Sequence, residues 1–284
     1  MSAPALPLAS VRRALAPLLG HLVLIAAAAV VLLPFAWMVL TALRPPADVL
    51  SEPFGLPTDA GAAIANVRQA VTSIPMLRLL LNGVVVVGGI VTVQLLVAIP
   101  CAYALAKLRF PGRGLLFGLV LLALCIPVQV PMLPLYLGLA KLHLLDSYAA
   151  LMLPFLLSVF AIFLLRQHFR AYPDAVLEAA RLDGLTQLEI LLRLVVPSAR
   201  PAIAAFVVFS ATAHWNDLFW PMIVVSSTDK ATPPLGLLFF RDGELGANYG
   251  ALMAAALIVT APLVAAFFAA QRQFIRGIAM TGLR

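Results

Sequence analysis

Charge is scarce in this chain, and its scarcity excludes most classes of soluble protein. Only 11% of the 284 residues are charged, whereas 63% are hydrophobic, and the mean hydropathy is +1.05. Because soluble domains carry roughly 25% charged residues, the composition predicts a membrane protein. None of the three lysines, Lys107, Lys141 and Lys230, follows a glycine, which excludes a G-x-x-x-x-G-K-[ST] phosphate-binding loop.

Clustered cysteine and histidine are missing as well. The two cysteines, Cys101 and Cys125, fall in apolar runs where neither a disulfide framework nor a four-ligand metal site can be built. The four histidines are isolated in the sequence, and no H-E-x-x-H or G-x-S-x-G motif occurs. We therefore expect no catalytic residue and no metal ion in this chain.

Long uncharged runs are what the chain does contain. Six of them can each supply the roughly 20 apolar residues that cross a bilayer, provided that the fifth continues past Asp217. We expect an all-α membrane protein with transmembrane helices at about 18–43, 79–105, 114–138, 147–166, 201–225 and 247–271. The third run contains Pro127, Pro131 and Pro134, which predict a kink there.

Basic residues are unevenly divided between the connecting segments. With the N-terminus inside, 13 of the 19 lysines and arginines fall on the inner face, and eight of the twelve acids fall outside. This distribution has the sense of the positive-inside rule, so both termini are expected in the cytoplasm. The net charge of +7 then reflects membrane topology, and we expect no nucleic-acid partner. Segments 44–78 and 226–246 become extracytoplasmic loops, and 167–200 becomes a cytoplasmic loop.

The cytoplasmic loop 167–200 begins with the signals of a short helix. Asp174, after Pro173, offers an acidic N-cap, the run 175–183 follows, and Gly184 occupies the position of a left-handed C-cap residue. A nine-residue helix is too short to persist alone in water, where roughly 12–15 residues are already marginal. Another surface must therefore pack on it, through small apolar positions that include Val176 and Leu177.

A second helix is predicted directly after the glycine. Thr186 and Glu189 have the T-x-x-E spacing of a capping box, and the helix that they open is expected to end before Pro197. Spacing alone leaves two interpretations of the loop equally open. It is either a docking surface for another protein, or an amphipathic segment on the membrane in which Glu178 and Arg181 form an i,i+3 pair.

Glu178-Ala179-Ala180 followed by Asp183-Gly184 resembles the EAA loop of the permease subunits of ATP-binding-cassette importers. Other stretches are similar to the carbohydrate-uptake, maltose-permease-like branch of that family and follow the family's order, namely Asn82, 102–113, 134–136, 145–148, 163–167, 215–217 and 271–277. Leu185 departs from the alanine that usually follows the Asp-Gly pair. The resemblance implies the type I importer permease fold, with residues 1–284 as one transmembrane domain.

The resemblance also implies roles and partners. The residues that couple to the ATPase are Glu178, Ala179, Ala180, Asp183 and Gly184. ATP-Mg is expected on a partner ATPase dimer, and this chain itself binds no cofactor. The other partners are a homologous second permease in a heterodimer, an extracytoplasmic carbohydrate-binding protein and membrane lipid, in the cytoplasmic membrane of a bacterium or archaeon. Loop 226–246 is suspected to contact the binding protein, and a plain solvated linker is the alternative.

Four polar or aromatic residues are candidates for the substrate pathway: Asn82, Gln129, Asn216 and Trp220. Asn216 and Trp220 are four residues apart and are expected to share a helix face, where an indole could stack on a sugar ring. The alternatives are interhelical hydrogen bonding for the amides, including Gln94, and an aromatic belt at the outer interface for the tryptophans Trp37, Trp215 and Trp220.

A self-sufficient secondary transporter is the alternative function. Such proteins keep acids or histidines near the bilayer midplane as ion or proton relays. Asp217 is the only acid within a predicted span. It lies about 24 Å along its helix from Pro201, close to the outer surface. The sequence therefore favours an importer that receives its energy from another subunit.

Overall fold

The computed structural model describes residues 8–51, 55–57, 59–242 and 248–281, and every regular element within these ranges is helical. The chain divides into two compact units. One comprises Met1–Ala70 with Leu245–Leu257, and the other comprises Val71–Glu244 with Ile258–Arg284. Each unit is described by itself.

The first unit is built around the amide of Asn66. It contains α1 (Leu8–Ala42), α2 (Pro46–Ser51) and most of α3 (Ala60–Thr72), and α15 (Tyr249–Thr281) begins in it. The buried Asn66 donates to the carbonyl oxygens of Ala42 at 2.9 Å and Arg44 at 2.8 Å. These bonds satisfy carbonyls at the end of α1 that have no partner within the helix. The helices α2 and α3 both lie within the predicted loop 44–78.

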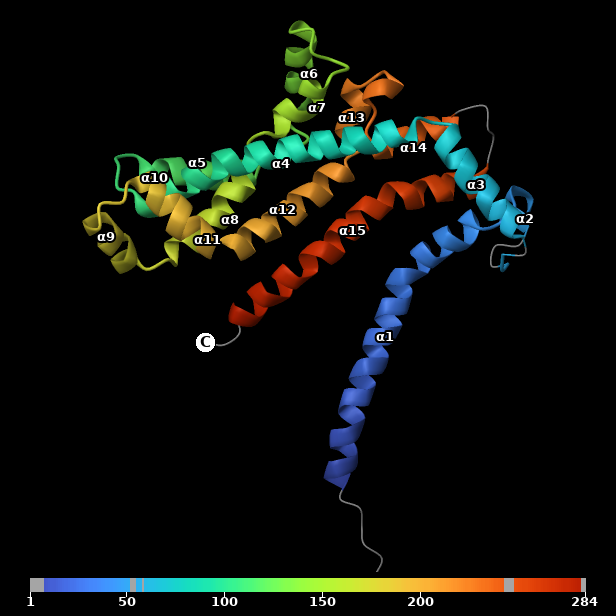
Figure 1. Ribbon diagram of the computed structural model, residues 1–284, viewed down its shortest axis with the longest axis horizontal. Coiled ribbons are helices and arrows are strands. Elements are labelled where there is room, and N and C mark those ends of the chain that lie inside the picture. Colours follow the sequence, from blue (N-terminus) through green and yellow to red (C-terminus); the bar gives the residue numbers. More distant parts are fainter. Residues whose placement is uncertain (1–7, 52–54, 58, 243–247, 282–284) are drawn as a thin grey trace, which may run out of the picture. The chain divides into compact units, whose positions relative to one another are not determined.

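The second unit is organised along α4 (Met76–Lys107). Two helices lie beside it in Figure 1, α8 (Val159–Arg170) and α12 (Arg200–Trp215), and α5 (Arg113–Leu124) packs against α8. Small buried residues, Ala98, Ala102 and Ala161, let α4 and α8 approach closely. Large apolar side chains such as Phe169 and Phe206 fill the surrounding core.

A second core lies toward the N-terminal end of α4. It buries Trp220 and Leu151 among short elements from two separate stretches of the chain. These elements are α6 (Met132–Lys141), α7 (Tyr148–Met152), η1 (Leu153–Phe155), α13 (Phe219–Val224), η3 (Thr228–Lys230) and α14 (Pro233–Asp242).

Three helices of the described chain are long and apolar enough to cross a membrane: Leu19–Ala42, Met76–Lys107 and Tyr249–Ala269. The number rises to five if each of two bent pairs is one span. The pair Tyr148–Phe155 and Val159–Arg170 bends by 43°, and the pair Gln187–Ser198 and Arg200–Trp215 bends by 76°.

Three predicted spans are interrupted. The span 147–166 breaks at 156–158, between η1 and α8. The run 114–138 is broken between α5 and α6 over 125–131, where Pro127 and Pro131 cannot donate a helical backbone hydrogen bond. The run 201–225 is broken after Trp215. A new helix, α13, begins at Phe219. Just before it, Asp217 Oδ1 accepts from the first two amides of that helix, of Phe219 at 3.1 Å and of Trp220 at 3.3 Å.

Candidate functional site

The predicted EAA helix is present as α9 (Asp174–Leu182), and it has a buried face and an exposed face. Leu177 and Ala180 are buried in the core of the chain itself, together with Phe169 and Ile190. The opposite face, which includes Glu178 and Ala179, is exposed. The packing surface that the short helix requires is therefore partly internal, and a second face remains uncovered in this chain.

The end of α9 is a complete Schellman motif. Gly184 has φ +84°, its amide donates to Arg181 O at 3.0 Å, and the amide of Leu185 donates to Ala180 O at 3.0 Å. Leu185 packs against the same core that buries Ala180. The larger residue after the Asp-Gly pair thus supplies the apolar contact that accompanies this motif. Asp183 precedes the glycine and is exposed.

The second helix starts as predicted but does not stop where predicted. Thr186 Oγ1 accepts from the Glu189 amide at 3.3 Å, and Glu189 Oε2 accepts from the Thr186 amide at 3.0 Å, which confirms the capping box. The Thr186 amide and the Thr186 hydroxyl, at 2.9 Å, both donate to Glu189 Oε2, and these two bonds hold the pKa of Glu189 below its ordinary value. The helix continues beyond Pro197 to Ser198, because the preceding turns widen into a π-helix at Leu191–Val195.

Lys107, at the end of α4, fixes the start of α9. Its Nζ lies 2.6 Å from Asp174 Oδ1 and also donates to Tyr172 O at 2.6 Å. The lysine side chain is 4% exposed, whereas that of Asp174 is 75% exposed. The hydrogen bond and the charge of Lys107 hold the pKa of Asp174 below its ordinary value. No spacing pattern predicts this contact, because 67 residues separate the two partners.

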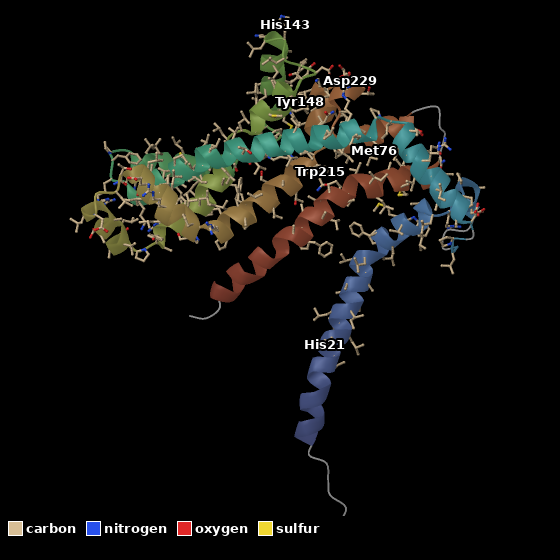
Figure 2. The ribbon with its side chains drawn as sticks, viewed as in Figure 1. His21, Met76, His143, Tyr148, Trp215 and Asp229 are labelled. Carbon is tan, nitrogen blue, oxygen red and sulfur yellow. The ribbon has the colours of Figure 1, made fainter. Side chains whose placement is uncertain are left out.

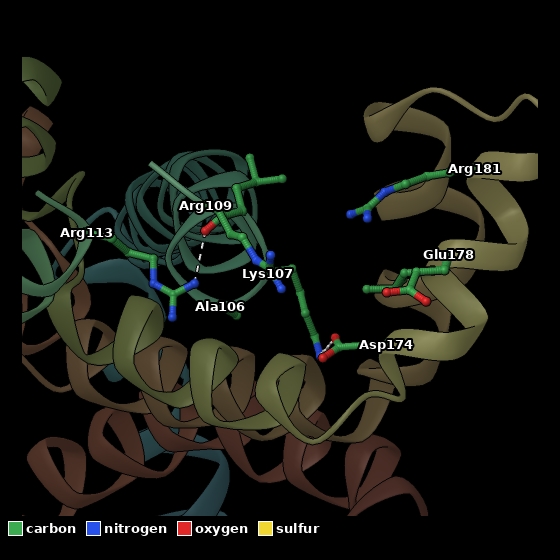
Figure 3. A pocket seen from close by; sticks show the side chains of 9 residues that line it. Ala106, Lys107, Arg109, Arg113, Asp174, Glu178 and Arg181 are labelled. Atoms are coloured by element: carbon green, nitrogen blue, oxygen red, sulfur yellow. Dashed lines mark hydrogen bonds and ion pairs between the residues drawn. The ribbon is translucent and has the colours of Figure 1, made fainter. Parts of the chain in front are cut away.

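A polar cleft of about 490 Å³ separates the end of α4 from α9. Figure 3 shows Lys107 reaching to Asp174, with Glu178 and Arg181 on α9 turned toward the same space as Arg109. Glu178 and Arg181 form no ion pair within the described part of the chain, so the i,i+3 pair of the membrane-surface interpretation is not formed. The carboxylate of Glu178 is consequently available to a partner.

The candidates for the substrate pathway are not brought together. Asn216 ends α12, is exposed and donates to Thr212 O at 2.9 Å, whereas Trp220 lies on α13 and is 1% exposed. The expectation of a shared helix face is wrong, because the break after Trp215 reorients the chain between the two residues. Gln129 is exposed in the break between α5 and α6.

Neither Trp215 nor Trp220 belongs to an aromatic belt facing lipid. Both are buried, and each indole Nε1 donates to a backbone carbonyl, of Val259 at 3.0 Å and of Ala150 at 2.9 Å respectively. A buried indole usually finds such a partner, because its single N–H has no water to bond.

Asn82 anchors the segment that follows α13. Its Nδ2 donates to the carbonyl oxygens of Asp229 at 3.0 Å and Ala231 at 2.8 Å, and its Oδ1 accepts from Tyr148 Oη at 2.6 Å. Arg78 adds an ion pair with Asp229 at 2.8 Å. Figure 2 shows Tyr148 and Asp229 on the same side of α4. The amide of Asn82 is thus fully occupied in packing, and the interpretation of interhelical bonding fits it better than substrate contact.

A second anchor for the same segment comes from Asp146. Its Oδ1 accepts from the amides of Ser226 at 3.1 Å and Ser227 at 3.0 Å, and from Ser227 Oγ at 2.9 Å. Burial raises the pKa of this carboxyl, but the hydrogen bonds from Ser227 and Ser226 outweigh burial, so the pKa lies below its ordinary value. The first residues of predicted loop 226–246 are therefore held in place, whereas 243–247 lie outside the described residues.

Comparisons with known proteins point in one direction. Residues 94–280 match the model of a family described as binding-protein-dependent transport system inner membrane component. The arabinooligosaccharides transport system permease protein AraQ of Halalkalibacterium halodurans is 36% identical over 195 residues, covering 69% of this chain and 70% of the relative. The sn-glycerol-3-phosphate transport system permease protein UgpE of Escherichia coli O1:K1 is 32% identical over 266 residues, covering 91% and 94%.

The fold has a counterpart among solved structures. A chain from the crystal structure of a bacterial ABC transporter involved in the import of the acidic polysaccharide alginate superposes with a TM-score of 0.80 at 22% sequence identity. The match covers 96% of this chain and 100% of that chain.

Proposed function

The chain belongs to the family of binding-protein-dependent transport system inner membrane components, and on that premise we propose that it is a permease subunit of an ATP-driven importer of carbohydrate or a carbohydrate derivative. It is a multi-pass inner-membrane protein and not an enzyme. Its family implies that it works with an ATPase and a binding protein. Relatives named for arabinooligosaccharides and for sn-glycerol-3-phosphate support the substrate class.

The exposed face of α9 is the observation that carries the coupling role. This helix lies inside the matched region, ends in a Schellman motif that leads into the capping box of α10, and leaves Glu178 without an ion pair in the described chain. Leu182 and Leu188 are 89% and 64% exposed on the same loop. Apolar side chains beside a free carboxylate suit a protein surface better than water alone. We assign that surface to the ATPase, which carries ATP-Mg.

Six membrane spans with both termini in the cytoplasm are part of the proposal. The three long apolar helices provide three spans, the bent pair Tyr148–Phe155 and Val159–Arg170 provides a fourth, and α12 with α13 provides a fifth. The helices α5 and α6 together form the remaining span, crossing the bilayer with a break at 125–131. Loop 167–200 then faces the cytoplasm together with the basic residues Lys107, Arg109 and Arg113.

The remaining partners follow from the same architecture. A homologous second permease completes the pathway as a heterodimer, and closure of the ATPase dimer moves the two permeases as rigid bodies. On the opposite side, the anchored residues 226–232 offer a fixed platform for the binding protein. This placement is supported by the three side chains that hold the segment, Arg78, Asn82 and Asp146.

The test is a charge reversal at Glu178 in the complete transporter. We expect Glu178→Lys to abolish co-purification of the ATPase subunits and to reduce uptake at least ten-fold. The matched control is Asp59→Lys, which makes the same change of charge on an exposed residue of the outer segment. If the Glu178 variant retains both ATPase subunits and uptake, α9 is not the docking helix.

The same cells can separate the two classes of transporter. Depleting ATP while the ion gradient is held should stop uptake, because this chain has no phosphate-binding loop and must receive energy from a partner. Uptake that persists would favour a secondary transporter.

A further inference from the structure

A cavity of about 380 Å³ lies within the second unit, at the place where two helix breaks meet. One break, at 125–131, separates α5 from α6, and the other, at 156–158, separates η1 from α8. Both contribute to the wall, through residues such as Ile126, Pro131 and Leu157. The volume falls within the roughly 300–1,000 Å³ range of small-molecule sites.

The cavity lies at the depth of the middle of α4. Gln94, which lines it, is about 27 Å along the helix from Met76 and about 20 Å from Lys107. Non-helical backbone at such depth is tolerated only where protein buries it or where it lines a cavity. Transporters place substrate sites at interrupted helices of this kind. The two breaks therefore mark this cavity as a candidate pathway site.

The orientation of the Gln94 amide is fixed by its neighbours. Its Nε2 donates to the backbone carbonyl of Phe155 at 2.7 Å, a group that can only accept. Its Oε1 accepts from Ser210 Oγ at 2.6 Å. An exchanged amide would place its oxygen against the Phe155 carbonyl, so only this orientation satisfies both contacts.

This orientation determines the tautomer of His214. The second hydrogen of Gln94 Nε2 points to His214 Nε2 at 3.4 Å, and an amide nitrogen has nothing to accept with. His214 Nε2 must therefore accept, which leaves the proton of the neutral ring on Nδ1. No hydrogen bond to Nδ1 is found among the described residues. The cavity wall thus holds one N–H donor that the protein does not use.

The rest of the wall is aromatic and uncharged. Phe155 packs against His214 at 5.0 Å between ring centroids and against Trp220 at 6.2 Å. Phe160 lies 5.4 Å from Phe209 on another part of the wall. No lysine, arginine, aspartate or glutamate is among the lining residues. Such a wall suits the C–H face of a sugar ring and offers no counter-charge to a phosphate ester or a carboxylate.

We propose that this cavity is a subsite for one neutral sugar ring on the import pathway, with His214 donating from Nδ1 to a ring hydroxyl and Phe155 and Phe209 packing on its apolar faces. The inference rests on the proposed importer function and narrows its substrate class to uncharged saccharides. Of the candidate pathway residues read from the sequence, only Trp220 lines the cavity.

The test is protection of a cysteine placed in the wall. Replacing Cys101 and Cys125 by alanine removes both native thiols, and Leu157→Cys adds one at a lining position that is 70% exposed. In the complete transporter, arabinotriose or maltotriose should slow labelling of this cysteine by N-ethylmaleimide. The charged probe sn-glycerol-3-phosphate should not. Equal protection by all three probes, or by none while a neutral probe is imported, overturns the subsite.

Substitutions of His214 test the donor itself. Asparagine can place an N–H near the position of Nδ1, and leucine cannot. We expect His214→Leu to raise the half-protecting concentration of the neutral probe at least five-fold, and His214→Asn to change it less than two-fold. His143→Asn is the matched control on an exposed loop residue whose φ of +55° asparagine tolerates.

Failure of the proposed importer function can be told apart from failure of the subsite alone. Absence of ATP-driven uptake for all three probes in cells counts against the proposed importer function. ATP-driven uptake of a neutral probe with unchanged protection in His214→Leu counts against the subsite alone.

Discussion

The ammonium of Lys107 lies 2.6 Å from Oδ1 of Asp174 and joins the C-terminal end of α4 to the first residue of α9. The same ammonium donates to Tyr172 O, so the chain just before α9 is held at two points. In the proposed transporter, this contact makes movement of the docked helix move α4 as well.

Loss of this contact should uncouple the transporter. We expect Lys107→Met to reduce uptake several-fold while ATP hydrolysis by the assembled complex continues, because α9 then moves without α4. Asp174→Asn should reduce uptake less than two-fold, since Lys107 keeps its bond to Tyr172 O. The measurement is the ratio of substrate imported to ATP hydrolysed in proteoliposomes. Unchanged ratios in both variants would contradict the coupling role.

Gly184 is required for its backbone conformation and not for space. A Cβ there would meet nothing within 4 Å, but φ is +84°. We expect Gly184→Ala to destabilise the loop by about 1 kcal/mol and Gly184→Asn by less. ATPase affinity should follow that order. Gly118→Ala, also in open space but within α5, is the control and should not weaken binding.

Gly83 presents the opposite case on α4. A Cβ at this position would lie 2.7 Å from Pro233 Cγ and 3.0 Å from Trp215, whereas a Cβ at Gly88 would meet nothing within 4 Å. We expect Gly83→Ala to cost about 1–3 kcal/mol through overpacking against the start of α14. Gly88→Ala should be neutral or stabilising, because alanine has the higher helix propensity. Thermal unfolding of the two purified variants compares them directly, and equal midpoints would contradict the packing.

The charge of Asp146 should make the outer segment sensitive to acid. Because the folded pKa is depressed, its contribution is present above the ordinary pKa of 3.8 and is lost as pH falls through the lower, folded value. Asp146→Asn keeps the acceptor oxygen and tolerates the φ of +53°, so it removes mainly charge. We expect it to cost no more than about 1 kcal/mol at neutral pH.

The measurement is thermal stability of the wild type and Asp146→Asn between pH 7 and pH 3. The difference between them should shrink toward zero in acid. A difference that stays constant across this range would mean that the carboxylate charge does not stabilise the segment.

The local features of the candidate site were predictable because they depend on neighbours in sequence. The glycine bend and the capping box each involve residues within five positions of one another. Gly184 therefore indicates the bend, and Thr186 with Glu189 indicates the capping box. The end of the second helix was not predictable in this way. A proline normally stops a helix, but here the π-helical turns at Leu191–Val195 let the helix continue past Pro197 to Ser198.

The contacts that distinguish this molecule join residues far apart in the chain. Lys107 reaches Asp174 across 67 positions, and Gln94 reaches His214 across 120. No spacing rule can pair such residues, because their meeting depends on how α4 packs against its neighbours. For the same reason the sequence placed Asn216 and Trp220 on one face, although a break after α12 separates them.

The sequence by itself determined the membrane class, the family and the two short helices around Gly184, because hydrophobic length, family motifs and capping residues are encoded locally. The tertiary structure decided which polar groups are used and which remain free. Asn82 is occupied by packing, whereas Glu178 has no ion pair and His214 Nδ1 no hydrogen bond within the described residues. That outcome depends on which helices meet, since a buried polar group is satisfied only by what lies against it.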